Sequence, residues 1–138
     1  MDFEQALKYL YKLPGGEHKG HYHLTLKRIE VLLRALGNPE RSFTTIIVGG
    51  TNGKGSVSCM LSSVLKEAGY SVGTYYSPHV FDFRERFVLN GTMVSKKDFV
   101  ASFLVVRKKI TNQSYFEVLT AIAFHLFSRK KVDFGILE

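Results

Sequence analysis

Apolar positions along the chain repeat in two rhythms, one typical of helices and one typical of buried strands. Residues 25–36 carry a helical stripe made of Leu26, Ile29, Leu33 and Leu36. Residues 57–68 carry a second stripe, made of Val57, Met60, Leu61, Val64, Leu65 and Ala68. Short apolar runs at 44–48, 71–76 and 132–137 predict strands, and the first run, TTIIV, has the pattern of a strand buried on both faces.

Turn and capping residues set the limits of the helices. A helix over residues 3–11 is predicted to stop at the PGG turn of residues 14–16, and glycines at positions 37 and 69 should end the two striped helices. Two capping-box patterns predict helices from 95 to about 110 and from 114 to about 127; their residues are Ser95 with Asp98 and Ser114 with Glu117. Just before the first of these helices, RFVLNGTMV predicts a β-hairpin that turns at Asn90-Gly91.

The order of these elements predicts an α/β fold. Strand 44–48, a glycine loop, helix 57–68 and strand 71–76 form a β-loop-α-β unit with parallel strands and a right-handed crossover. We expect a P-loop-type doubly wound parallel sheet with helices on both faces and one β-hairpin excursion. Residues 1–42 would be a helical lead-in, and residues 43–138 the start of the sheet. No element follows the last strand, whose edge would be uncovered, so we expect the amino-terminal portion of a longer polypeptide.

Composition narrows the class of protein. The chain has 138 residues, 45% of them hydrophobic, which is typical of one globular domain. No run of about 18 apolar residues predicts a membrane span, and the first residues lack a secretory signal. The single cysteine, Cys59, is expected to be a packed side chain in a reducing, cytoplasmic environment. The formal charge of +7 is consistent with binding of anionic small molecules or with a solvated basic surface. The sequence lacks the array of aromatic and basic residues that is typical of an RNA-binding sheet.

The segment GGTNGKGS, residues 49–56, predicts a phosphate site. Backbone N–H groups at a helix start lack intrahelical acceptors, and glycines let the backbone approach phosphate oxygens closely. Lys54 adds a mobile charge and Ser56 a hydroxyl. The strict P-loop pattern fails, because Val48 replaces its first glycine and Gly55 its serine or threonine. A glycine-rich helix entry with an incidental lysine remains the alternative.

Polar groups end all three predicted strands. The first strand runs into the glycine loop, the second into Ser77 and the third into Glu138. Ligands of open α/β sheets bind beyond the carboxyl ends of the strands, so these groups are expected to meet at one edge. Hydroxyl and carboxylate oxygens are ligands that Mg²⁺ accepts alongside water and phosphates. A serine before proline and a terminal glutamate are also common as a turn residue and a solvated residue.

Several motifs together resemble one family. GGTNGKGS, YYSPH with FRERF, SYFEVLTAIAF and VDFGILE, with LTLKRIEVLLRALGNP before them, resemble folylpolyglutamate synthase, often bifunctional with dihydrofolate synthase, of the Mur ligase superfamily. The resemblance runs in order across nearly the whole chain. It implies an incomplete Mur-ligase-like ATP-binding domain and an ATP- and Mg²⁺-dependent ligase. ATP would phosphorylate a folate or dihydropteroate carboxylate, and L-glutamate would then form the amide.

The resemblance also implies site residues. The ATP loop would comprise Thr51, Asn52, Gly53, Lys54, Gly55 and Ser56, with Lys54 as the catalytic cation. Ser77 and Glu138 match magnesium positions. The substrate segments would comprise Leu24, Thr25, Leu26 and Arg28, together with Ser114, Tyr115, Phe116 and Glu117. Thr25 departs from the family's usual glycine, and Tyr76 from its commoner Thr or Ser.

Other interpretations of these residues stay open. Glu117 would serve equally as a helix cap, and Phe116 at helical spacing is more typical of a core. Arg84 and Arg86 would be solvated, pair with Glu85 or serve a substrate loop, while His79 fits a plain loop residue. The histidines of residues 18–23 lack the cysteines or carboxylates of a zinc site.

The alternatives in function are a Mur-type cell-wall amino-acid ligase, a stand-alone nucleotide-binding module and, last, a nucleic-acid binder. For the leading interpretation we expect small-molecule partners only, no nucleic acid or membrane, and a monomer at full length. Groups needed for catalysis would lie beyond residue 138. The 138-residue chain alone is therefore expected to be inactive and to bind nucleotide weakly at most.

Overall fold

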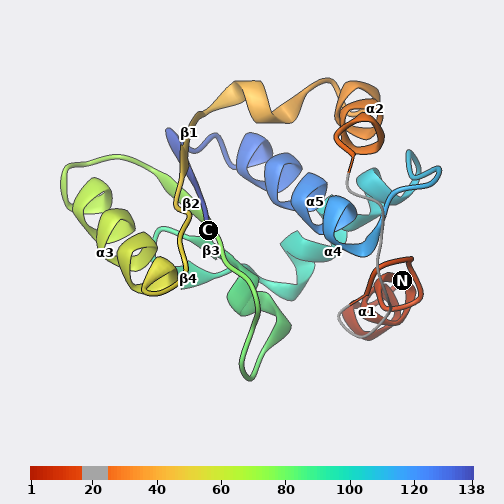
Figure 1. Cartoon of the computed structure of the whole chain (residues 1–138), viewed down its shortest axis with the longest axis horizontal. Helices are drawn as coiled ribbons and strands as arrows, with labels where there is room; N and C mark the ends of the chain where they lie inside the picture. The colour runs from red at the N-terminus through yellow and green to blue at the C-terminus, as the bar shows by residue number, and fades with distance from the viewer. Residues whose placement is uncertain (17–24) are drawn as a thin grey trace. The chain divides into compact units, whose positions relative to one another are not determined.

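The computed structural model describes residues 1–16 and 25–138 (Figure 1). These residues form two compact units, one of residues 1–39 and 96–126 and one of residues 40–95 and 127–138. We call them the helical unit and the sheet unit. Leu24 and the three histidines of residues 18–23 lie outside the described residues. Within the described ranges, no helix is both long enough and apolar enough to cross a membrane.

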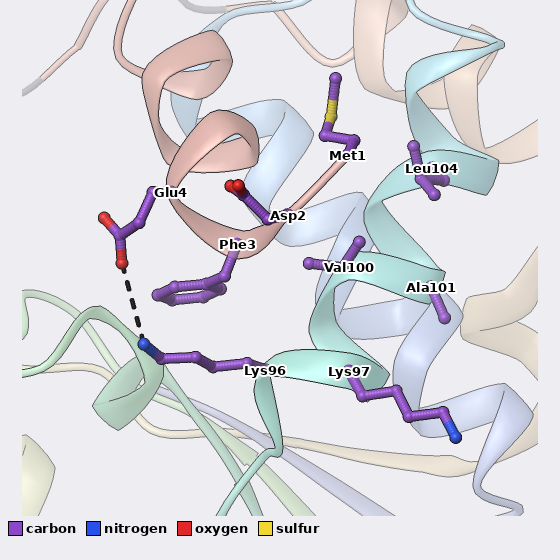
Figure 2. Close-up of a pocket in the computed structure, with 9 residues that line it drawn as sticks. All are labelled: Met1, Asp2, Phe3, Glu4, Lys96, Lys97, Val100, Ala101 and Leu104. Atoms are coloured by element: carbon purple, nitrogen blue, oxygen red, sulfur yellow. Dashed lines mark ion pairs between the residues drawn. The ribbon is translucent and has the colours of Figure 1, made fainter.

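The helical unit contains α1 (Phe3–Leu10), α2 (Lys27–Ala35), α4 (Lys96–Arg107) and α5 (Tyr115–Arg129) as far as Leu126. Capping fixes where α1 begins, because the side chain of Asp2 accepts a hydrogen bond from the N–H of Gln5 at 2.8 Å and a reciprocal bond closes the box. Helix α1 packs on α4, where the rings of Phe3 and Phe99 meet edge to face at 5.5 Å. Figure 2 shows Lys96 of α4 reaching across the Phe3 ring to Glu4, 3.8 Å away.

The sheet unit contains strands β1 (Thr44–Ile47), β2 (Val72–Tyr75), β3 (Phe87–Leu89), β4 (Thr92–Met93) and β5 (Phe134–Leu137). Helix α3 (Lys54–Glu67) lies beside the sheet and contacts β2 and β5 (Figure 1). Two 3₁₀ turns, η1 (Pro39–Ser42) and η2 (Phe83–Arg86), precede β1 and β3. The strand order is β1-β5-β2-β3-β4, with β1, β5 and β2 parallel and the hairpin antiparallel. The predicted α/β fold with a mostly parallel sheet is confirmed.

The hairpin turns where the sequence predicts it. Asn90 and Gly91 have φ values of 49° and 81°, the left-handed pair that a two-residue hairpin turn needs. Strand β3 pairs with β2, so the hairpin extends the main sheet and is no excursion from it. The side-chain carbonyl of Asn90 also accepts the N–H of Val72 at 2.8 Å, which ties the turn to the start of β2.

Two predictions about the sheet are wrong. The last strand, β5, is central, and in the described part of the sheet the edge strands are β1 and β4. Strand β1 is accordingly not buried on both faces, since Ile47 is 78% exposed. An apolar run indicates that a segment forms a strand, but it does not indicate where that strand lies in the sheet. The β1–β5 and β5–β2 pairings decide the strand order.

The prediction that the apolar stripe of α3 faces the core is also wrong. Val57, Met60 and Val64 are exposed, whereas Ser58 and Ser62 are buried, and Ser58 donates its hydroxyl to the carbonyl of Lys54 at 2.8 Å. Cys59 is exposed as well, contrary to the expectation of a packed thiol. Small serines suit a face that approaches the sheet closely, and periodicity alone does not tell which apolar residues face it.

One side of the sheet unit is packed by two phenylalanines over two glycines. Gly73 of β2 and Gly135 of β5 are register partners. The rings of Phe127 and Phe43, 5.8 Å apart, fill the space where side chains at these glycines would stand. The absent Cβ atoms therefore let two aromatic rings lie directly on the strands.

Candidate functional site

The glycine loop presents a bare helix start. Gly53 caps α3 in the left-handed conformation, with φ of 75°, and no side chain caps the helix there. The N–H of Val57 makes the first helical bond, to the carbonyl of Gly53 at 3.0 Å, so the N–H groups of residues 54–56 have no acceptor within the helix. Lys54 folds back and donates to the carbonyl of Gly50 at 2.9 Å. These amides and this ammonium group together suit an anion.

The carboxyl ends of the parallel strands are level with one another. Ile47 is in register with Leu137, and Leu137 with Tyr75. One residue further on, the N–H of Val48 donates to the carbonyl of Leu137 at 2.8 Å, and the N–H of Glu138 donates to that of Tyr75 at 3.0 Å. The glycine loop, Ser77 and Glu138 therefore start from the same edge of the sheet, as the sequence predicts.

Ser77 and Glu138 are in direct contact at this edge. The backbone N–H of Ser77 donates to Oε2 of Glu138 at 2.8 Å, so the carboxylate is held against the residue that carries the hydroxyl. Mg²⁺ binds one or two protein oxygens and completes its shell with water and phosphate oxygens, which this pair fits. In the described part of the chain, no group of three or more His, Cys, Asp and Glu side chains is placed to hold a metal by itself.

Tyr76 connects this edge to α3. Burial raises the pKa of its phenol, and the neighbouring Cys59 of α3 and the charge of Glu138 raise it further. With a tyrosine at this position, the Ser77–Glu138 contact is formed.

The loop between β2 and β3 is organised by carboxylates. Glu85 accepts hydrogen bonds from the N–H groups of Val80, Asp82 and Phe81, and these bonds lower the pKa of its carboxyl. Arg84 pairs with Asp82 at 2.7 Å, not with Glu85 as one of the sequence interpretations had it. At the loop tip Phe81 is 94% exposed. Arg86 is buried and donates to His79, and this pair too was missed, because a charged, loop-like sequence carries no signal of burial.

Most of the predicted substrate residues of the helical unit line one cavity of about 730 Å³. Its walls include Thr25, Leu26, Arg28, Ser114, Phe116 and Glu117, together with Gly15, Ile29 and Thr120. Phe116 is 53% exposed, so the interpretation of this ring as core is wrong. Tyr115 does not line the cavity; it is buried and stacks on Tyr11 at 6.0 Å.

Glu117 joins the helix cap to this cavity. Its Oε2 accepts from the N–H of Ser114 at 2.7 Å and from Nε of Arg28 at 3.1 Å, while the N–H of Glu117 donates to the Ser114 hydroxyl at 3.3 Å. The predicted capping role is confirmed, with an ion pair added to it. Gln113, which no sequence motif singles out, donates to the carbonyl of Arg28 at 2.8 Å and holds α2 against the start of α5.

A second hollow of the helical unit lies between α1 and α4 and measures about 580 Å³ (Figure 2). Met1, Phe3, Val100, Ala101 and Leu104 make it apolar, and charged side chains stand at its rim. None of the predicted site residues lines it. The chemistry of the helical unit is therefore concentrated in the cavity of Arg28 and Glu117.

The sheet unit defines the class of this protein: an α/β protein whose glycine-rich loop opens a helix at the carboxyl edge of a parallel sheet. No family model matches the chain. It is 38% identical over 138 residues to the dihydrofolate synthase/folylpolyglutamate synthase of Buchnera aphidicola subsp. Schizaphis graminum, a match that covers 99% of this chain and 32% of the relative.

The chain is also similar to solved structures of the same kinds of enzyme. The folylpolyglutamate synthase of Thermotoga maritima has a TM-score of 0.89 at 42% identity, over 99% of this chain and 32% of that one. A folylpolyglutamate synthase complex with AMPPCP and folate has a TM-score of 0.90 at 31% identity, over 99% and 34%. The bifunctional enzyme of Yersinia pestis with AMPPNP and a Mn ion has a TM-score of 0.89 at 32% identity, over 100% and 33%.

The predicted resemblance is confirmed: the chain is homologous to the amino-terminal part of folylpolyglutamate synthases and dihydrofolate synthases. It spans about a third of the length of the relatives that it matches.

Proposed function

We propose that this chain supplies the nucleotide-phosphate loop, part of the magnesium site and part of the pterin site of an ATP-dependent ligase that joins L-glutamate to a folate or dihydropteroate carboxylate. The observation that supports the proposal is that the glycine loop, Ser77 and Glu138 all follow strands that end at one edge of the sheet, with Ser77 bound to Glu138. The homologous complexes with AMPPCP, AMPPNP, folate and a Mn ion support it.

The loop of residues 51–56 would hold the phosphates of ATP. The N–H groups of Lys54, Gly55 and Ser56 are free to donate, and the dipole of α3 places about half a positive charge at the same point. Lys54 would exchange its present acceptor, the carbonyl of Gly50, for a phosphate oxygen. Its charge would then stabilise the negative charge that spreads over the transferred phosphoryl group.

Ser77 and Glu138 would hold Mg²⁺. The bond from the Ser77 N–H keeps the Glu138 carboxylate at the edge of the sheet. A bound magnesium ion neutralises phosphate charge and orients the triphosphate. The chain's own part is to keep one carboxylate and one hydroxyl fixed beside the loop amides.

The cavity of the helical unit would take the pterin end of the substrate. The exposed ring of Phe116 offers a stacking surface, and the Arg28–Glu117 pair offers charged hydrogen-bonding groups at the cavity wall. Transfer of the γ-phosphoryl group to the substrate carboxylate gives an acyl phosphate. The amine of glutamate then attacks the acyl carbon, phosphate leaves, and the amide forms.

A chimaera tests this proposal. The full chain is joined to the remaining two thirds of the Thermotoga maritima synthase, in place of the 32% that it matches. We expect ADP release that requires ATP, L-glutamate and a folate or dihydropteroate acceptor together. Lys54→Met should reduce kcat roughly 100-fold or more, the size seen when one transition-state donor is removed. Lys66→Met, at the other end of α3, is the control and should leave kcat unchanged.

Two results would contradict the proposal. One is a soluble chimaera without substrate-dependent ADP release, and the other is full activity of Lys54→Met. The 138-residue chain alone is expected to show no turnover and at most weak binding of magnesium-ATP in calorimetry. Tight binding by the isolated chain would favour the stand-alone nucleotide-binding module instead. We also propose that the parent acts in the cytoplasm as a monomer, without nucleic-acid partners.

A further inference from the structure

A buried arginine holds a histidine at the end of β2. Arg86 is only 2% exposed, and its Nε donates to Nδ1 of His79 at 2.9 Å. Phe83 lies against both: the guanidinium carbon is 5.7 Å from the centre of its ring, and the His79 ring meets it edge to face at 5.4 Å. The imidazole is therefore fixed in position by a hydrogen bond and by an aromatic contact.

The hydrogen bond also fixes where the imidazole carries its proton. A guanidinium group has donors only and stays charged in proteins, so Nδ1 of His79 has to be the acceptor. An imidazole that accepts at Nδ1 is neutral and carries its proton on Nε2. In the described part of the chain, Nε2 of His79 has no hydrogen-bond partner. One oriented N–H donor is thus left over.

The backbone of Arg86 lies beside the strand end already described. The N–H of Tyr76 donates to the carbonyl of Arg86 at 2.9 Å, which places Arg86 beside the last residue before Ser77. Ser77 is bound to Glu138, and His79 follows two residues later. The pair thus belongs to the same strand end as the proposed magnesium residues.

We propose that Arg86 is a positioning residue that keeps His79 in the Nε2–H form, and that His79 donates this hydrogen bond to an anionic oxygen of the bound nucleotide or acyl phosphate. The ligand half of this inference rests on the proposed function. The half that concerns the proton on His79 does not, because it depends only on the contact between two side chains of this chain. A neutral donor adds an oriented hydrogen bond to the anion without adding another charge.

The proton position is tested on the 138-residue chain without substrate. Nitrogen-15 NMR of chain labelled in the histidine rings, at neutral pH, distinguishes a protonated Nε2 from a protonated Nδ1. The spectrum of His79→Gln assigns the His79 signals among the five histidines. We expect the Nε2–H form in the wild type and in the control Arg84→Gln, and a mixture of both forms in Arg86→Met. A proton on Nδ1 in the wild type, or an unchanged His79 signal in Arg86→Met, overturns the inference.

The donor role is tested in the chimaera by two substitutions of His79. His79→Phe keeps an aromatic ring but has no N–H, and we expect it to lower kcat or the affinity for magnesium-AMPPCP about tenfold. His79→Gln offers an oxygen to Arg86 and an N–H in place of Nε2, so it should recover most of that loss. Arg86→Met breaks the same contact but leaves the imidazole N–H, so it should lose less than His79→Phe, whereas a purely structural role of the contact predicts equal losses. Equal kcat and affinity for His79→Phe and the wild type overturn the donor role.

The two proposals fail in different ways. A parental chimaera that neither turns over nor binds magnesium-AMPPCP refutes the proposed function and the ligand half of this inference together. The NMR result still decides whether Arg86 sets the proton on His79. An active chimaera in which His79→Phe is unaffected refutes the donor role and leaves the ligase standing.

Discussion

A methyl group added to Gly73 tests the packing of the sheet unit. The Cβ of an alanine at this position of β2 would stand 2.5 Å from a ring carbon of Phe127, closer than real side chains approach. Phe127 is fully buried and packs edge to face on Phe43, which itself covers Gly135, so the ring has little room to move.

The magnitude follows from two opposing effects. Forcing an extra methyl into a packed core costs about 1–3 kcal/mol, and this site belongs near the upper end because the obstacle is a buried ring. Replacing glycine also restricts the unfolded chain, which returns roughly 0.4–1 kcal/mol. Gly73→Ala should therefore lower the free energy of unfolding by about 2 kcal/mol, measured by urea denaturation followed by circular dichroism.

A control and a double mutant sharpen this test. Gly55→Ala, in α3 where no atom lies within 4 Å of the new Cβ, should leave stability unchanged or raise it by about 0.5–1 kcal/mol. Phe127→Leu removes the obstructing ring, so Gly73→Ala should cost less in that background, with a coupling energy on the order of 1 kcal/mol. Stability of Gly73→Ala within 0.5 kcal/mol of the wild type, or strictly additive effects, would refute the reasoning.

Three further predictions concern charge and capping. Glu117→Gln removes the charge that faces Arg28 at 3.1 Å within a mostly buried pair, and it should lower the free energy of unfolding by about 1–3 kcal/mol. The control Glu4→Gln, in an exposed pair with Lys96, should lower it by less than about 0.5 kcal/mol. Equal urea midpoints for the two variants would contradict this. Ser114→Ala removes the hydroxyl cap of α5 and should cost about 1 kcal/mol, with Ser63→Ala on the exposed side of α3 as the control in the same denaturation assay. Because the N–H groups of Val80, Asp82 and Phe81 lower the folded-state pKa of Glu85, its ionised form stabilises the fold above the unfolded pKa of about 4.3, and that stabilisation is lost as the pH falls through the lower folded-state value. The stability gap between wild type and Glu85→Gln should thus narrow on acidification, and a gap that stays constant from neutral pH down to about pH 3 would show that the carboxylate does not hold this loop.

Local chemistry was sufficient where the decisive atoms lie close together in the sequence. The Asn90-Gly91 turn and the Ser114–Glu117 cap each depend on residues at most three positions apart, and each forms as predicted. The bare start of α3 follows in the same way from the glycines around Lys54. The family motifs reach further only because several of them occur together in order.

The remaining features were decided by partners distant in the sequence. Strand β5 is central because it pairs with both β1 and β2, so β1 lies at an edge of the sheet. Ile47 is therefore exposed, although its apolar run predicts a buried strand. The same long-range packing turns the serines of α3 inward and leaves Phe116 at a cavity wall. Arg86 and His79, seven residues apart, are joined within the connection between β2 and β3, two strands that pair with each other. Periodicity says that a face is apolar, but which surface that face meets is a property of the whole chain, because burial is gained only from contacts between elements.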